Sequence, residues 1–149
     1  MSIINHLYLK DAKPTDIPHL LLWDTPNDLE INQLLFNNNA QQISYRDNLL
    51  GRIKKKQKFL MLHENLDQEL EAIKQICEYA TKPVILLTDL DILITYLYTQ
   101  PDSPISLFWK QLEYMRHLQS ILWILLPSKL SPPNWNKRHL ESVVSDGPN

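Results

Sequence analysis

Four short runs of hydrophobic residues alternate along the chain with longer stretches that are hydrophobic at every third or fourth position. The runs occupy residues 19–23, 59–62, 83–88 and 121–126. Nearly continuous hydrophobicity over so short a length is typical of a strand buried on both faces, and the spacing between the runs is that of amphipathic helices. The pattern predicts an α/β fold: a single-domain three-layer sandwich with a mostly parallel sheet of four to five strands flanked by helices.

The segment after the first run carries the signals of a helix start. Thr25 is expected as the N-cap residue, Pro26 as the first helical residue and Asp28 as the acidic partner in a capping box. Asparagines at 37–39 favour the end of this helix, because their side chains compete with the helix backbone for hydrogen bonds. The inward positions are Ile31, Leu34 and Leu35.

Three further helices are expected from the spacing of hydrophobic residues. The first covers residues 43–56, and its inward residues are Ile43, Leu49, Leu50 and Ile53. The second has as its inward residues Leu66, Leu70, Ile73, Cys77 and Ala80. The third follows Ser103 and Pro104, and its inward residues are Ile105, Phe108, Leu112 and Met115.

The remaining segments show weaker patterns. Residues 92–99 fit a helix and a strand equally well, and a short helix is expected over 136–144. A chain of 149 residues has the length of one domain. We therefore expect residues 1–140 to form a single α/β domain and residues 141–149 to form a flexible C-terminal tail.

The composition excludes several classes of protein. Only two glycines are present, so neither a glycine-rich phosphate loop nor a dinucleotide-binding fingerprint is encoded. The single cysteine, Cys77, excludes an internal disulfide and a cysteine metal site. The hydrophobic runs are far shorter than the ~20 residues of a membrane span, and the first residues do not resemble a signal peptide. A cytoplasmic protein without a membrane partner is expected.

Positive charge is concentrated in residues 46–58, which hold six cations and one acid within a chain of net charge −2. Such a block is typical of contact with nucleic acid or another anion, and also of a solvated helix end. The candidate nucleic-acid-binding and anion-binding residues are Arg46, Arg52, Lys54, Lys55, Lys56 and Lys58.

Acidic residues follow several of the predicted strands. The carboxyl ends of parallel strands meet at one edge of the sheet, where ligands bind in open α/β proteins. The residues expected there are Asp24, His63, Glu64, Asp89, Asp91, Ser128 and Lys129. The carboxylates among them suit Mg²⁺, and they equally suit the capping of the helices that follow. If they bind Mg²⁺, the catalytic set is Asp24, Glu64, Asp89 and Asp91.

Residues 83–91, a hydrophobic strand that ends in acids, resemble the Walker-B strand of an ATPase of the AAA+ kind. The helix over 103–119 and the run at 121–126 lie where the next helix and the sensor strand of that family lie, and the resemblance spans residues 59–140. The chain lacks the family's Gly-x-x-x-x-Gly-Lys-[Ser/Thr] loop, and Leu90 stands where the catalytic Glu usually follows. The resemblance implies a nucleotide-hydrolase-like scaffold that has lost hydrolysis.

Aromatic residues are frequent between positions 96 and 135, and such side chains are favoured both as anchors of protein interfaces and as the filling of a small core. The candidate partner-binding residues are Tyr96, Tyr98, Trp109, Tyr114 and Trp135. We therefore expect a non-catalytic accessory or adaptor subunit without a cofactor or bound metal. It would bind partner proteins in a larger assembly, and that assembly would act on nucleic acid if the basic block binds it. The alternative is a Mg²⁺-dependent phosphoryl-transfer enzyme or nuclease that uses the acidic set.

Overall fold

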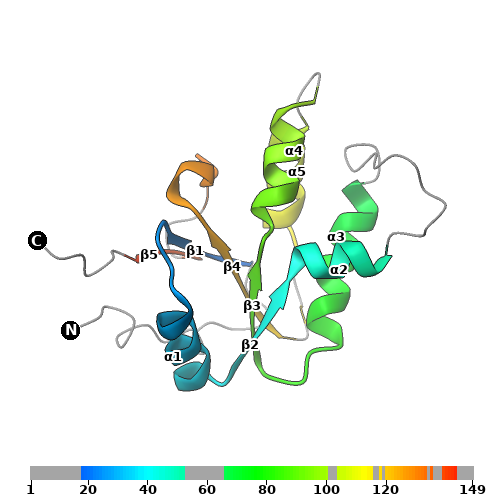
Figure 1. Cartoon of the computed structure of the whole chain (residues 1–149). Helices are drawn as coiled ribbons and strands as arrows, with labels where there is room; N and C mark the ends of the chain where they lie inside the picture. The colour runs from blue at the N-terminus through cyan, green and yellow to red at the C-terminus, as the bar shows by residue number, and fades with distance from the viewer. Residues whose placement is uncertain are drawn as a thin grey trace, which may run out of the picture.

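A computed structural model of the protein describes residues 18–52, 66–100, 104–115, 118, 120–133, 135 and 139–143. Within these residues the chain forms one all-parallel, five-stranded sheet flanked by helices (Figure 1), which confirms the α/β class. The strands are β1 (His19–Trp23), β2 (Ala40–Ser44), β3 (Val84–Thr88), β4 (Ile121–Leu126) and β5 (Leu140–Val143). The helices are α1 (Asp28–Asn38), α2 (Tyr45–Arg52), α3 (Leu66–Glu78), α4 (Asp91–Tyr98), α5 (Ile105–Glu113) and the short 3-10 helix η4 (Ser128–Leu130).

The strands lie in the order β2-β3-β4-β1-β5. Parallel strands need crossover connections, and α1 to α5 lie in three of them. The connection that leaves β1 reaches β2 on the far side of β4 and β3, whereas the connection that leaves β4 reaches β5 on the far side of β1. Because these two neighbouring strands send their connections in opposite directions, the gap between β1 and β4 is the topological switch point of the sheet.

Side chains alternate between the two faces of the sheet, and both faces are covered. Along β1, Leu20 and Leu22 pack with residues of α2 to α5, whereas Leu21 and Trp23 pack with residues of α1. Figure 1 shows α1 standing apart from the other four helices. Every residue of β1 and of β3 is buried, which explains why both strands read as continuous runs.

The start of α1 differs from the prediction by two residues. Asn27, not Thr25, is the N-cap: its side-chain oxygen accepts a hydrogen bond from the Glu30 backbone N–H at 2.8 Å. The Asn27 side-chain amide in turn donates to the Glu30 carboxylate, so a contact between two side chains stands in place of the capping box expected from Thr25 and Asp28. The end of the helix is as predicted, because Asn39 adopts the left-handed conformation that terminates it.

The prediction of one helix over 43–56 is wrong at its start, where Ala40–Ser44 form β2 and α2 begins only at Tyr45. An edge strand paired on one side stays partly exposed, so β2 lacks the hydrophobic run that marks β1 and β3. Leu49 is buried as expected, whereas Leu50 is 56% exposed. Residues 53–56 and the strand expected at 59–62 lie outside the described residues.

The short helix expected over 136–144 is wrong for residues 140–143, which form β5 and pair in parallel with β1. The last strand thus extends three residues past the expected end of the domain. Like β2, it is a short edge strand with polar residues at its centre, Glu141 and Ser142. Residues 92–98, which fitted a helix and a strand equally well, lie in α4. The helix expected over 103–119 is shorter in the structure, because α5 ends at Glu113, but Phe108 and Leu112 are fully buried as expected.

Candidate functional site

The predicted acidic residues reach the carboxyl edge of the sheet but are separated there. Asp24 follows β1 and Asp89 follows β3, with β4 between these strands. Neighbouring strands lie about 4.8 Å apart, so the ends of β1 and β3 are roughly 10 Å apart. Asp91 is the first residue of α4, whereas His63 and Glu64 lie outside the described residues.

Asp24 is held by the segment that follows β4. Its two carboxylate oxygens accept hydrogen bonds from the Ser128 backbone N–H at 2.7 Å and from the Ser128 hydroxyl at 3.0 Å. Hydrogen bonds to a charged acceptor are stronger than neutral ones. This contact lies at the switch point between β1 and β4, the place where ligands bind in open α/β sheets. A carboxylate that is already satisfied therefore occupies the expected ligand position.

Asp89 is held by the neighbouring strand on its other side. Its carboxylate accepts a hydrogen bond from the Ser44 hydroxyl at 2.5 Å, and the Ser44 oxygen also accepts from the Asp47 backbone N–H at 3.2 Å. Asp89 has a φ of 66°, a left-handed conformation that Asp tolerates better than most residues. The Asp89 side chain thus connects the end of β3 to the first turn of α2.

The described part of the chain contains no group of three His, Cys, Asp or Glu residues that are placed to hold a metal ion. Asp24 and Asp89 bind separate serines, Ser128 and Ser44. The magnesium site stays a prediction, because one of its four members, Glu64, lies outside the described residues.

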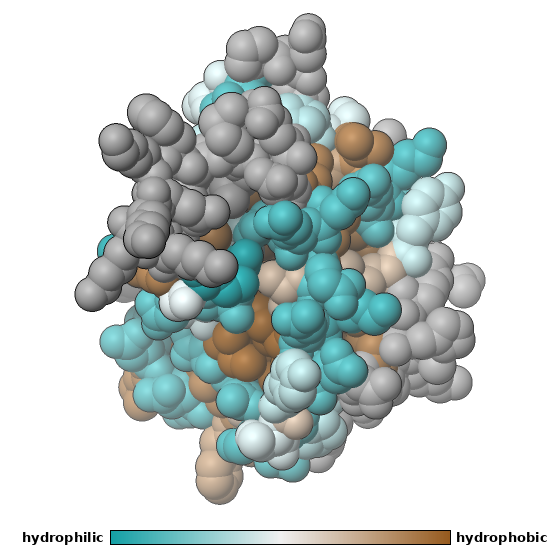
Figure 2. Space-filling model, turned by 90° about the vertical axis from the view of Figure 1, so that its right-hand side faces the viewer, coloured by the Kyte–Doolittle hydropathy of each residue, from teal (hydrophilic) through white to brown (hydrophobic). Residues whose placement is uncertain are grey.

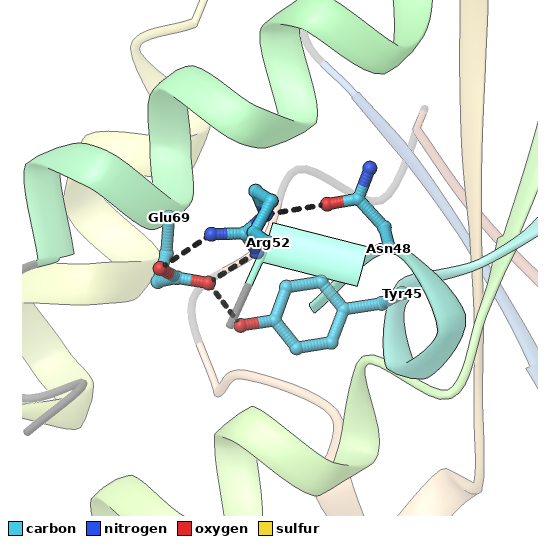
Figure 3. A network of polar contacts seen from close by, with 4 residues as sticks. All are labelled: Tyr45, Asn48, Arg52 and Glu69. Carbon is cyan, nitrogen blue, oxygen red and sulfur yellow. Dashed lines mark hydrogen bonds and ion pairs between the residues drawn. The ribbon is translucent and has the colours of Figure 1, made fainter. Parts of the chain in front are cut away.

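A polar network that the sequence analysis missed connects α2 to α3 (Figure 3). Glu69 is buried, with 3% of its side chain exposed, and its carboxylate receives two hydrogen bonds from the Arg52 guanidinium, at 2.7 and 3.0 Å. The Tyr45 hydroxyl donates to the same carboxylate, and the Arg52 Nε donates to Asn48 at 2.7 Å. The sequence held one signal of this network, because a glutamate three residues after Leu66 falls on the inward face of α3.

This network shifts the pKa values of its members. Burial raises the pKa of Tyr45 above its usual range, and the hydrogen bond to Glu69 raises it further. The hydrogen bond to Glu69 also raises the pKa of Arg52. Both terminal nitrogens of Arg52 are bound to Glu69, so this guanidinium links α2 to α3 while 33% of the Arg52 side chain stays exposed.

Arg46 and Arg52 are the described members of the basic block, and both are exposed on α2, although Arg52 is bound to Glu69. Lys54, Lys55, Lys56 and Lys58 lie outside the described residues. Figure 2 shows the face that forms the right-hand side of Figure 1, where hydrophilic side chains cover much of the described surface and hydrophobic ones lie between them. Nucleic-acid binding by residues 46–58 stays a prediction.

The candidate partner-binding aromatics divide into two groups. Trp109 and Trp135 are buried, 7% and 6% exposed, and pack edge to face with their ring centres 6.0 Å apart. Both complete the core beneath α5, in agreement with the alternative that these aromatics fill a small core. A partner-binding role for the five candidate residues stays a prediction. Tyr98 and Tyr114 are exposed, by 50% and 68%, and Tyr96 is partly buried.

Exposed hydrophobic side chains lie on α4 and α5, which contact each other and project beyond the sheet at the top of Figure 1, and also on α1, where Phe36 is 87% exposed. We call these two helices, with the Tyr114 that ends α5, the α4–α5 hairpin. Half of the large hydrophobic residues that are exposed in the described chain belong to it. They are Ile92, Tyr98, Leu107 and Tyr114.

A pocket of about 250 Å³ opens between α5 and the segment that follows η4. We call it the α5 pocket. Its lining residues are Ser106, Trp109, Lys110, Glu113, Pro132, Pro133 and Trp135. The indole nitrogens of Trp109 and Trp135 are fully enclosed and have no hydrogen-bond partner, so neither N–H reaches the open space.

No helix in the described residues is both long enough and hydrophobic enough to cross a membrane. No family model matches the chain, and comparison with curated proteins and with solved structures found no match.

Proposed function

We propose that this protein is a non-catalytic accessory or adaptor subunit with a nucleotide-hydrolase-like fold, and that it binds a partner protein through the α4–α5 hairpin. The observation that carries the proposal is the exposure of Ile92, Tyr98, Leu107 and Tyr114 on two neighbouring helices. Exposed hydrophobic groups that gather on one part of a soluble domain are typical of an interaction surface.

The order of the strands supports the nucleotide-hydrolase-like part of the proposal. In ATPases of the AAA+ kind, the sensor strand lies between the strand that precedes the phosphate loop and the Walker-B strand. Here β4, which corresponds to the sensor strand in the resemblance, lies between β1 and β3. The likeness therefore extends from the local pattern of β3 to its neighbours in the sheet.

The carboxyl edge supports the non-catalytic part. In a phosphate-binding α/β protein, the loop after the first strand and the N-terminus of the next helix receive the anion. Here that loop contains Asp24, and the first turn of α1 contains Asp28 and Glu30. Three carboxylates repel a phosphate group, and Asp24 is already bound to Ser128. The loop after β1 is thus poorly suited to bind a phosphate directly, which supports the loss of nucleotide hydrolysis. It does not count against the Mg²⁺-dependent alternative, in which the metal ion would lie between the carboxylates and the phosphate.

The test is to compare tagged variants expressed in the source organism. Leu107→Asp and Tyr114→Ser place polar groups on the hairpin, and we expect each to reduce recovery of the co-purified partner at least tenfold. Each has a matched control on another helix, because Leu50 and Tyr79 are as exposed as their counterparts. Leu50→Asp and Tyr79→Ser should leave recovery unchanged. Equal recovery from hairpin and control variants, or a wild-type protein that elutes alone as a monomer, would refute the proposal.

A further inference from the structure

We infer that the α5 pocket receives one hydrophobic side chain of the partner protein, and that a carboxylate beside this anchor residue pairs with Lys110. The inference rests on the proposed function and adds the chemistry of the partner. It assigns the recognition of the partner to a pocket next to the exposed face of the hairpin.

The size of the pocket favours a single side chain. Sites for cofactors and other small molecules usually have volumes of about 300–1,000 Å³, and the α5 pocket, at about 250 Å³, is smaller. Its walls include the indole rings of Trp109 and Trp135 and the rings of Pro132 and Pro133. Because both indole N–H groups are enclosed, the tryptophan and proline side of the pocket offers hydrocarbon and aromatic surface, whereas Ser106, Lys110 and Glu113 make its other side polar. An aliphatic or aromatic side chain packs on the first side, and a polar group beside it meets the second.

The position of the pocket on α5 connects it to the exposed surface. Ser106, Lys110 and Glu113 line the pocket, at the spacing of one helix face. Leu107 and Tyr114 lie one residue further on and form the neighbouring face, to which Lys110 also belongs. A concave site lined by tryptophan and bordered by exposed hydrophobic groups has the anatomy of an interface hot spot. One partner can therefore cover both the pocket and the hairpin.

The charge at the rim of the α5 pocket favours an acidic residue beside the anchor residue of the partner. Lys110 is exposed, and its ammonium has no ion-pair partner among the described residues. Glu113, the other charged residue at the pocket, already interacts within the protein. The free charge at the rim is thus positive, and a partner carboxylate beside the anchor residue complements it.

The test uses a phage-displayed library of random 12-residue peptides, selected on the immobilised full chain. We expect the enriched peptides to share a hydrophobic residue with Asp or Glu within two positions. Selection on Lys110→Glu should replace these acids with Lys or Arg, whereas Lys74→Glu, a matched charge reversal on α3, should leave the consensus unchanged. Absence of an enriched consensus, or an acidic consensus that Lys110→Glu retains, would overturn the inference.

Occupancy of the pocket is tested with one enriched peptide, labelled for fluorescence anisotropy. Ser106→Phe fills the pocket from an exposed position, so it avoids the folding defect expected when a buried tryptophan is removed. We expect Ser106→Phe, or alanine at the peptide's anchor residue, to weaken binding at least tenfold. Undiminished binding contradicts the inference. If Leu107→Asp loses the natural partner while Ser106→Phe keeps it, the proposed function stands and the pocket inference fails; if neither variant loses it, both fail.

Discussion

The carboxyl edge of the sheet and the α4–α5 hairpin use their side chains in opposite ways. At the edge, Asp24 and Asp89 are polar groups whose bonding partners are serines of this same chain. On the hairpin, Leu107 and Tyr114 are hydrophobic groups that remain in contact with solvent. The polar groups at the edge, where α/β enzymes have their active sites, are hydrogen-bonded within the chain, whereas the hydrophobic groups of the hairpin are not covered by the described residues. We therefore propose that the hairpin carries the function.

The largest difference in stability is expected between substitutions on the two sides of α5, because one side packs in the core and the other faces solvent. Phe108→Ala removes a fully buried ring and should lower the free energy of unfolding by about 3–5 kcal/mol. Leu107→Ala, one residue earlier, should change it by no more than about 0.5 kcal/mol. Urea denaturation measures both. A similar loss in the two variants would show that Leu107 belongs to the core.

A loss of about 3 kcal/mol is expected for Arg52→Ala, because the Glu69 carboxylate would remain buried without its counter-charge. Arg46→Ala, an exposed arginine on the same helix, is the control and should lie within about 0.5 kcal/mol of the wild type. Thermal or urea unfolding of the two variants measures this difference in stability. If Arg52→Ala is as stable as Arg46→Ala, the network in Figure 3 contributes little and Arg52 is available to an outside anion.

Alkaline pH probes the groups buried beneath the helices. Burial raises the pKa of the Cys77 thiol to about 12. The unfolded chain loses this proton near pH 9, so above that value the folded state binds more protons and the free energy of unfolding falls. The fall should approach 1.4 kcal/mol per pH unit for this group. Cys77→Ala should show a shallower decline between pH 9 and 11 in urea denaturation. Parallel declines in the two proteins would contradict the prediction.

The smallest effect is expected at the carboxyl edge. Asp24→Asn retains one acceptor for Ser128 but loses the charge, so we expect a loss of about 1 kcal/mol in thermal unfolding and unchanged partner recovery. Glu71→Gln, on the exposed face of α3, is the control. Mg²⁺ should produce no saturable stabilisation of the wild type. A saturable increase in Tm that Asp89→Asn/Asp91→Asn abolishes would reverse the comparison and support the phosphoryl-transfer alternative.

The predictable strands are those buried on both faces. β1, β3 and β4 are buried almost throughout, and such burial requires the hydrophobic runs that the sequence displays. β2 and β5 pair on one side only and stay partly exposed, so their composition does not distinguish them from a helix or a tail. The prediction failed at the two edges for this reason.

The candidate sites were less predictable than the fold. For Trp109 and Trp135, the sequence left an interface anchor and a core residue equally open. They are buried because each packs against the other across about 25 residues of sequence, a contact that no local spacing indicates. Tyr98 and Tyr114 are exposed as a partner-binding role requires, since no described element covers that side of the hairpin.

The sequence by itself determined the class of the fold and most of the inward hydrophobic residues of its helices, because periodic burial leaves a periodic pattern of hydrophobic residues. It also determined the absence of a glycine-rich phosphate loop, since only two glycines are present. The tertiary structure alone decided which polar groups are satisfied. Asp24 and Ser128 are 104 residues apart and meet only because β1 lies beside β4, and Tyr45 and Glu69 meet only because α2 packs against α3. Hydrogen bonds between distant segments depend on strand order and helix packing, which a local pattern does not contain.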